Sequence, residues 1–295
     1  MNAAFTIGLD IGGTQIKSVI LDPQGSLLHQ QLFQTKDHLP GEWLQSVHGA
    51  VKELRKSIAD QVYRIGIAAP GLPNAENTAI AVMPGRLLGL EGLIWEEAFS
   101  TPTYVLNDAI AALYAEAHFG AAKGHKNAVM LTLGTGVGGA ILIDGKPYQG
   151  AFGKAGHIGH MVIDSDGPPD VTGIPGSLED AIGNATVGIR SNGTFNSTRA
   201  LVEAHVDGDA FATEVWLCSV RKLAIGIASI TNILSPEAVI LGGGITQAGA
   251  VLMDPLKKYM EQYEWRAGGN QVALKFATMN EMSGAIGAAY YSMKK

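Results

Sequence analysis

The sequence contains a single cysteine, Cys218, among 295 residues. One thiol excludes an internal disulfide framework and a cysteine-rich zinc site, and it favours a reducing compartment such as the cytoplasm. No basic and apolar leader opens the chain, and no uncharged apolar run reaches about 18 residues. We therefore expect neither an export signal nor a membrane span.

Positive charge is also scarce. Lys and Arg number 21 against 27 Asp and Glu, the net charge is −6, and no Lys/Arg run occurs. This balance argues against nucleic acid or an anionic membrane as the main partner. An anionic substrate would have to be held by backbone amides and a cation.

Apolar residues and glycine are abundant. The chain is 46% hydrophobic with 38 glycines, and its length favours two lobes, each with a core. Strand and helix patterns alternate, which is typical of the α/β class with a mostly parallel sheet. We expect strands at 5–10, 15–21, 27–34, 64–69, 104–106 and 272–277, helices at 41–59, 108–120, 211–234, 248–262 and 283–295, and a loop over 72–100 with one short helix near Trp95. The small residues of the last helix favour close packing, and we expect it to return to the N-terminal lobe.

A glycine turn near the start is the first functional candidate. Gly12, Gly13 and Thr14 reverse the chain between two predicted strands, and Asp10 ends the first of them. Exposed amides can hold a phosphate chain, and the carboxylate can hold its Mg²⁺, usually through water. The alternative is an ordinary hairpin with an aspartate beside its turn. We expect Lys17 to face solvent without a role.

The same pattern returns in the middle of the chain. At an offset of 122 residues, Asp10 aligns with Thr132 and Gly12 with Gly134. A later apolar strand at 238–241 ends in glycines, as the strand at 64–69 does. This favours a duplicated lobe, with two hairpins facing one polyphosphate across a cleft. The alternative is two unrelated hairpins.

Asn107 and Asp108 lie where a predicted strand gives way to a helix. Side chains at such a position often project into the cleft of an α/β fold. Asp108 could accept the proton of an attacking hydroxyl, and Asn107 could orient neighbouring hydroxyls. The residues alone leave open the alternative that Asp108 caps the helix.

Six motifs together resemble one known family. They are Asp10-Ile11-Gly12-Gly13-Thr14, Ala69-Pro70-Gly71, Asn107-Asp108, Leu133-Gly134-Thr135-Gly136-Val137-Gly138-Gly139, Gly156-His157-Ile158-Gly159-His160 and Leu241-Gly242-Gly243-Gly244. In order and spacing the chain resembles the ROK family (repressors, open reading frames, kinases) over its whole length. The resemblance implies a duplicated actin-like, ribonuclease H-like ATPase fold. It also implies a cytoplasmic sugar kinase, commonly a homodimer.

The resemblance further implies a set of site residues. Asp108 would be the general base for a hexose hydroxyl, that of C6, and Asp10 would hold Mg²⁺ through water. The implied lobes are 1–108 with 284–295, and 109–283. Sugar would be bound by Gly71, Asn107, Asp108, His157, His160 and Glu179, and ATP by Asp10, Gly12, Gly13, Thr14, Thr132, Gly134, Thr135, Gly136, Gly242, Gly243 and Gly244.

Two positions depart from the family pattern. Relatives have glutamate where this chain has His157, so the choice of sugar is open. Many relatives also bind zinc through the equivalent of His160 and three cysteines, and this chain has no cysteine in that segment. His160 and Asp170 alone would make a poor zinc site, so we expect no structural zinc. Hydrogen bonds and prolines should hold the loop instead.

Three functions are compatible with these features. The first is a hexose kinase, and the second is a kinase for an N-acetylated hexosamine or an unusual hexose, which His157 makes more plausible. The third is a non-catalytic sugar sensor or regulator. Regulators of the family carry a helix-turn-helix domain before the first motif, whereas only nine residues precede Asp10 here. The presence of Asp108 also favours an enzyme.

Overall fold

The computed structural model describes residues 4–295 except 38, 40, 60 and 84–86. Its contacts divide the chain into two compact units. The first contains the chain up to Gly124, 149–154 and 278–295; the second contains 125–148 and 155–277. The lobe boundaries implied by the resemblance stay a prediction.

A five-stranded sheet in the order β3-β2-β1-β4-β7 forms the centre of the first unit. The first three strands are antiparallel neighbours, whereas β1, β4 and β7 run parallel. The predicted strands are therefore present. Their bounds are β1 (Phe5–Ile11), β2 (Gln15–Leu21), β3 (Leu27–Gln34), β4 (Tyr63–Ala69) and β7 (Thr103–Asn107).

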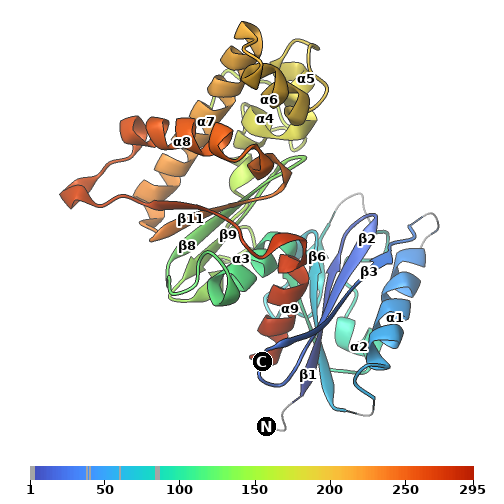
Figure 1. Ribbon diagram of the computed structural model, residues 1–295. Helices are drawn as coiled ribbons and strands as arrows, with labels where there is room; N and C mark the ends of the chain where they lie inside the picture. Colours follow the sequence, from blue (N-terminus) through green and yellow to red (C-terminus); the bar gives the residue numbers. More distant parts are fainter. Residues whose placement is uncertain (1–3, 38, 40, 60, 84–86) are drawn as a thin grey trace. The chain divides into compact units, whose positions relative to one another are not determined.

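Helices cover both faces of this sheet (Figure 1). On one face, α1 (Glu42–Arg55) buries Trp43, Val47 and Leu54, which recur at helical spacing. On the other face lie α3 (Asp108–Phe119) and α9 (Ser283–Met293). The expected loop over 72–100 holds α2 (Trp95–Phe99) and a hairpin of β5 (Leu72–Pro73) and β6 (Ile80–Val82), while its residues 84–86 lie outside the described part.

The last helix packs onto the first unit, as expected, and glycines make the contact possible. A Cβ on Gly66 would lie 1.9 Å from the carbonyl oxygen of Ala288, and one on Gly8 would lie 2.1 Å from that of Ala285. Because these neighbours are backbone atoms, no side chain can give way. The small residues of α9 therefore allow direct contact between helix and sheet.

The second unit repeats the sheet. Its order is β10-β9-β8-β11-β12, with β8, β11 and β12 parallel and β9 antiparallel to β8. The matching order agrees with the predicted duplication and the α/β class. The strands are β8 (Ala128–Leu133), β9 (Val137–Ile143), β10 (Lys146–Tyr148), β11 (Ala238–Gly242) and β12 (Ala273–Phe276).

The offset of 122 residues that aligns the first strands of the two hairpins is wrong by one residue for their second strands. Ile7 pairs with Ile20, whereas Val129 pairs with Ile141 rather than Leu142. The reason is that the second turn is one residue shorter than the first. The alignment holds for the first strand of each hairpin, and therefore for Asp10 and Thr132.

Two long helices build the core of the second unit. They are α7 (Ala210–Leu234) and α8 (Ala250–Tyr263), and they pack against the apolar residues of β8 and β11. Three shorter helices were not expected: α4 (Leu178–Ile182), α5 (Val187–Arg190) and α6 (Thr198–Val206).

In the described part of the chain, only α7 is long and apolar enough, by length and composition, to cross a membrane. It carries Arg221 and Lys222 in its middle, and side chains such as Trp216, Leu223 and Ile227 are fully buried in the core.

Candidate functional site

The first unit brings four of the predicted residues to one edge of its sheet. Because β1, β4 and β7 run parallel, their carboxyl ends lie together. Asp10 pairs with Ala68 near the end of β4, and Ala69 pairs with Asn107 at the end of β7. Gly71 lies two residues after Ala69 in the chain. Its oxygen accepts a 3.1 Å hydrogen bond from Nδ2 of Asn107.

Asn107, and not Asp108, caps helix α3. Oδ1 of Asn107 accepts hydrogen bonds from the amides of Ala109 at 3.0 Å and Ile110 at 3.4 Å. Asp108 is the first residue of the helix and is exposed. Its Oδ1 accepts the amide of Ala109 at 2.8 Å. Since Asn107 supplies the cap, the alternative explanation for Asp108 loses its main support.

Opposing effects act on the pKa of Asp10. Burial raises the pKa of this carboxyl to about 6, the Lys17 ammonium lowers the pKa, and the negative charge of Asp108 raises it again. Lys17 Nζ lies 3.9 Å from Asp10 Oδ2. A Cβ on Gly284, in the first turn of α9, would lie 2.7 Å from the same oxygen. Asp10 therefore lies at a helix N-terminus, which favours a negative charge.

Lys17 was expected to face solvent without a role, and that expectation was wrong. Its side chain is 29% exposed and forms the ion pair with Asp10. The register of the hairpin places Asp10 directly opposite Lys17, so both side chains lie on the same face. A register count across the turn is the signal that could have found it.

The first glycine turn is fixed through its carbonyl groups. The hydroxyl of Thr35 donates to the Gly12 oxygen at 2.7 Å, and its amide donates to the Thr14 oxygen at 2.9 Å. Among the described residues, the amides of Gly13 and Thr14 donate to no backbone acceptor. Gly13 and Thr14 are exposed, so their amides can serve a ligand.

The second glycine turn is built in the same way. The amides of Asn184 and Ala185 donate to the oxygens of Gly134 and Thr135, both at 2.9 Å. Thr135 is exposed between the two glycines. Thr132, the counterpart of Asp10, lies on β8 and pairs with Gly242 on β11. The predicted phosphate residues of this unit and the glycines after β11 are therefore neighbours.

Gly242, the last residue of β11, and the two glycines that follow it are glycine for different structural reasons. Gly243 has a φ of +89°, and a Cβ there would lie 2.3 Å from the oxygen of Leu133. A Cβ on Gly242 would lie 2.9 Å from the end of the Met130 side chain. Gly244, in contrast, would meet no described atom within 4 Å, and neither would Gly13 or Gly134. Internal packing therefore does not require glycine at Gly13, Gly134 or Gly244.

A pocket of about 570 Å³ adjoins the second turn. Its volume is in the range of small-molecule sites. Gly134, Thr135 and Gly244 line it. Sequence reasoning missed the other lining residues, which come from the 3₁₀ turn at 184–186, from helix α6 and from the 3₁₀ turn at 244–248: Asn184, Thr198, Arg199, Val202, Glu203, Ile245, Gln247 and Ala248. No element was expected at 198–206, so no pattern connected these residues to the turn.

Glu179 is tied to the second turn. Its Oε2 accepts the amide of Val137 at 2.9 Å, and a Cβ on Gly136 would lie 2.1 Å from that oxygen. Gly136 is thus glycine because Glu179 occupies the adjacent space. The segment of His157 and His160 packs on the same hairpin, since a Cβ on Gly159 would lie 2.0 Å from the Val137 oxygen.

Asp170 holds the loop in which relatives carry cysteines. Its carboxylate is buried and accepts hydrogen bonds from the hydroxyl and amide of Thr172, at 2.7 and 2.8 Å, and from the amide of Ile174 at 3.0 Å. His160 Nδ1 lies 3.2 Å from the other oxygen. Burial raises the pKa of Asp170, but the hydrogen bonds from Thr172, His160 and Ile174 outweigh it and hold the pKa well below its usual value.

These contacts, together with a bridge between Pro169 and Pro175, agree with the expectation that hydrogen bonds and prolines hold the loop. In the described part of the chain, no three His, Cys, Asp or Glu side chains group as a metal site. For Mg²⁺ the chain offers carboxylate oxygens, the ligand type this ion prefers, on Asp10 and Asp108.

A family model described as the ROK family matches residues 6–295. The chain belongs to the ROK family. A glucokinase of Streptomyces coelicolor is 32% identical over 96% of this chain and 96% of its own length. The crystal structure of a ROK hexokinase from Thermus thermophilus is 27% identical, covers 98% of this chain and 99% of that one, and has a TM-score of 0.85.

A second ROK structure, a glucokinase from Streptomyces griseus in complex with glucose and AMPPNP, is 26% identical with a TM-score of 0.80. It covers 99% of this chain and 100% of that one. The paired sheets of the present ROK protein are those of the duplicated actin-like ATPase fold, as the resemblance implied.

Proposed function

We propose that this ROK protein is an ATP-dependent sugar kinase, with Asp108 as the general base. The exposure of Asp108 at the start of α3, with the helix cap supplied by Asn107, is the observation that carries the proposal. The similarity to glucokinases over nearly the whole chain supports the reaction class. A sensor would not need an exposed carboxylate at this position.

In the proposed step, Asp108 accepts the proton of the sugar C6 hydroxyl while that oxygen attacks the γ-phosphorus of ATP. A new O–P bond forms, the bond to the bridging oxygen breaks, and ADP leaves with those electrons. Phosphoryl transfer needs little covalent help, so positioning and charge neutralisation supply most of the rate. Besides its proposed contact with the sugar, Asn107 would position Asp108, because its side chain fixes the first turn of α3.

ATP is assigned to the two turns and the pocket. The amides near Gly12, Gly13 and Thr14 in the first unit, and near Gly134, Thr135 and Gly136 in the second, would hold phosphate oxygens. The pocket beside Gly244 would hold the nucleoside. The open space at Gly13, Gly134 and Gly244 supports this assignment, since a ligand explains glycine where packing does not.

Mg²⁺ would neutralise the phosphate charge, held by Asp10 through water. Lys17 lowers the pKa of Asp10 and so opposes the effects of burial and of Asp108. The carboxylate is thereby kept available to a cation near neutral pH. Thr132, at the same register in the second unit, would contribute a hydroxyl.

The sugar is assigned to Gly71, Asn107, His157, His160 and Glu179. One oxygen of Glu179 already accepts the Val137 amide, and the other would accept a ligand hydroxyl. His160 is oriented by Asp170. A plain hexose is the first candidate because the named relatives include glucokinases. His157 favours a second candidate, an N-acetylated hexosamine or an unusual hexose, since an imidazole can donate where glutamate only accepts.

A coupled ADP-release assay with purified protein tests the proposal. The panel should contain glucose, mannose, fructose, allose, N-acetylglucosamine and N-acetylmannosamine, each with Mg²⁺ and ATP. We expect turnover with at least one sugar and phosphate on C6 of the product, as identified by NMR. If no sugar is phosphorylated while ATP and a sugar both bind, the kinase proposal is wrong.

The variant His157→Glu separates the two candidate substrates. It restores the residue that relatives have, and we expect preference to move toward glucose by an order of magnitude or more, because buried polar groups discriminate strongly. An unchanged ratio of kcat/KM values across the panel would show that His157 does not select the sugar. His29→Glu, on the outer strand β3, is the matched control.

We also propose a cytoplasmic homodimer without a nucleic-acid or membrane partner. Light scattering coupled to size exclusion gives the oligomeric state directly. A mass of one chain, about 31 kDa, would contradict the dimer.

A further inference from the structure

A second pocket lies in the first unit, away from the residues assigned above. Its volume is about 520 Å³, and it is formed by the last turns of α1, the end of α2 and the start of β4. Tyr63 lines it and pairs with Phe5 at the beginning of β1, whereas Asp10 lies five residues further along. The rise of a strand, about 3.3 Å per residue, puts roughly 16 Å between these two ends of the sheet.

The pocket collects positive charge in a chain whose net charge is −6. Lys52, Arg55 and Lys56 line it, and among its described lining residues there is no Asp or Glu. Lys56 pairs with Glu53, so its charge is compensated. Lys52 and Arg55 form no ion pair with any residue in the described part of the chain.

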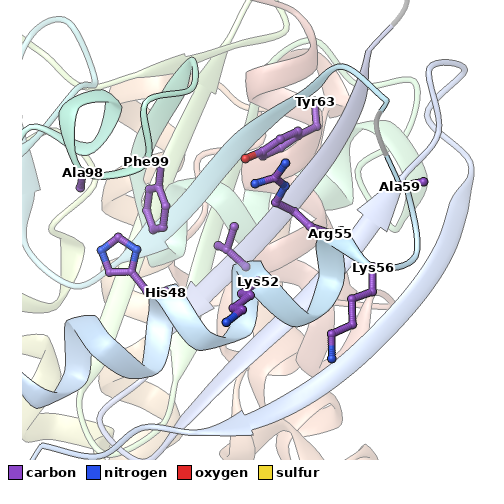
Figure 2. Close-up of a pocket in the computed structure, with 9 residues that line it drawn as sticks. His48, Lys52, Arg55, Lys56, Ala59, Tyr63, Ala98 and Phe99 are labelled. Atoms are coloured by element: carbon purple, nitrogen blue, oxygen red, sulfur yellow. The ribbon is translucent and has the colours of Figure 1, made fainter.

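Aromatic rings form the walls. The guanidinium of Arg55 lies 5.0 Å from the centroid of the Tyr63 ring, and the His48 ring lies 4.7 Å from that of Phe99 (Figure 2). Stacking on a ring orients a guanidinium and leaves donors at its edge. Val51 and Ala98 complete an apolar surface. The pocket thus combines an apolar floor with two cations that pair with no described carboxylate.

Basic residues in the last turn of a helix also balance the helix dipole. That effect accounts for the presence of Lys52 and Arg55 on α1. It does not account for their convergence on one pocket with two aromatic walls. The dipole effect alone predicts that removing the charges of Lys52 and Arg55 lowers the stability of the protein but does not weaken the binding of a ligand.

We propose that this pocket binds a small organic phosphate. A phosphate monoester carries close to two negative charges at neutral pH, which matches the two uncompensated cations. The pocket is in the size range of small-molecule sites, so a free phosphate ion would leave the apolar walls uncovered. An organic body attached to the phosphate covers them. The site does not depend on the proposed kinase reaction.

Titration calorimetry on the full chain tests this with phenyl phosphate, inorganic phosphate and benzyl alcohol. Mg²⁺ and ADP are present at saturation, so that the candidate nucleotide site is occupied. We expect saturable binding of phenyl phosphate, at least about tenfold tighter than that of inorganic phosphate, because only the ester covers the rings. No saturable binding of phenyl phosphate, or equal affinity for the two anions, would overturn the proposal.

The double variant Lys52→Gln with Arg55→Gln locates the site. We expect its affinity for phenyl phosphate to fall at least about tenfold, because two charge-assisted hydrogen bonds are lost. Arg221→Gln with Lys257→Gln, two exposed residues of α7 and α8, removes the same charge elsewhere. An equal loss in both double variants would reduce the effect to net charge, and no loss in the first would place the ligand elsewhere.

Phe99→Leu separates the rings from the cations. The variant keeps both charges. We expect its affinity for phenyl phosphate to fall severalfold and its affinity for inorganic phosphate to stay unchanged. Circular dichroism and ADP affinity should match those of the parent in every variant. If Phe99→Leu changes the two anions equally, the aromatic wall has no part in recognition and the organic-phosphate assignment is wrong.

Discussion

The two units share one sheet order but cover their sheets differently. In the first unit, Gly8 pairs with Gly66, and the backbone of α9 lies directly on them. In the second, the same register positions are Met130 and Ile240, whose large side chains are buried. One strand pattern therefore accepts either a helix backbone or large side chains, and the residue at one position decides which.

The strand ends differ as well. The first unit has two carboxylates there, Asp10 and Asp108, close enough that the charge of one raises the pKa of the other. The second has the hydroxyl of Thr132 and a pocket beside its glycine turn. Under the proposed function, the first unit would supply the base, the cation ligand and one phosphate-binding turn, and the second would supply the other turn and the nucleoside pocket.

The largest effect is expected at the sheet face. Gly66→Ala places a Cβ against the Ala288 backbone, and we expect it to lower the free energy of unfolding by about 3 kcal/mol or more. Ile240→Val, at the matching position of the second unit, should cost about 1 kcal/mol, because it removes only one methylene. Urea denaturation measures both. Equal losses would show that the two faces are packed alike.

The second-largest expected effect is a pH dependence of stability that distinguishes the strand ends of the two units. The pKa of Asp10 is 3.8 in the unfolded chain and about 6 when folded, so the folded protein binds the extra proton between these values. The contribution of this extra proton to the free energy of unfolding is then fully present below pH 3.8 and is lost as the pH rises through about 6. Asp10→Asn removes this dependence.

We therefore expect the stability of Asp10→Asn, relative to the parent, to rise by on the order of 2 kcal/mol between those pH values. Denaturation curves at several pH values give the difference. Thr132→Val changes the matching residue of the second unit and should show a difference that does not vary with pH. A flat profile for Asp10→Asn would mean that this carboxyl titrates normally.

The smallest effect concerns the open glycines. Gly244→Ala puts a methyl group into space that no described residue fills, so we expect an unchanged melting temperature and a KM for ATP raised about tenfold, or roughly 1.4 kcal/mol. Gly49→Ala, on the exposed side of α1, also meets no atom and should leave KM unchanged. If Gly244→Ala binds ATP normally, the pocket of the second unit does not hold the nucleotide.

Local patterns in the sequence predicted much of this fold. Alternating strand and helix signals located the main elements, and the repeat of the glycine turn revealed the duplication. The register of the second hairpin was missed by one residue, because a single offset cannot show a shortened turn. The segment of α4 to α6 was missed because its helices are short, and α4 and α5 span only five and four residues.

The candidate site was predicted in part. Residues at strand ends, such as Asp10 and Asp108, could be found because motif position and strand direction fix where they lie. The pairing of Lys17 with Asp10 was missed because it depends on cross-strand register. The role of Asp170 in its loop depends on several hydrogen bonds at once, which no residue spacing reveals.

The kinetics of Asp108→Asn test the central claim most directly. The variant keeps the size and most hydrogen bonds of the side chain but cannot take a proton. With the sugar that the panel identifies, we predict a kcat lower by at least about 10²-fold, with sugar and ATP affinities close to those of the parent. A kcat within a few-fold of the parent would contradict the assignment of Asp108 as the base.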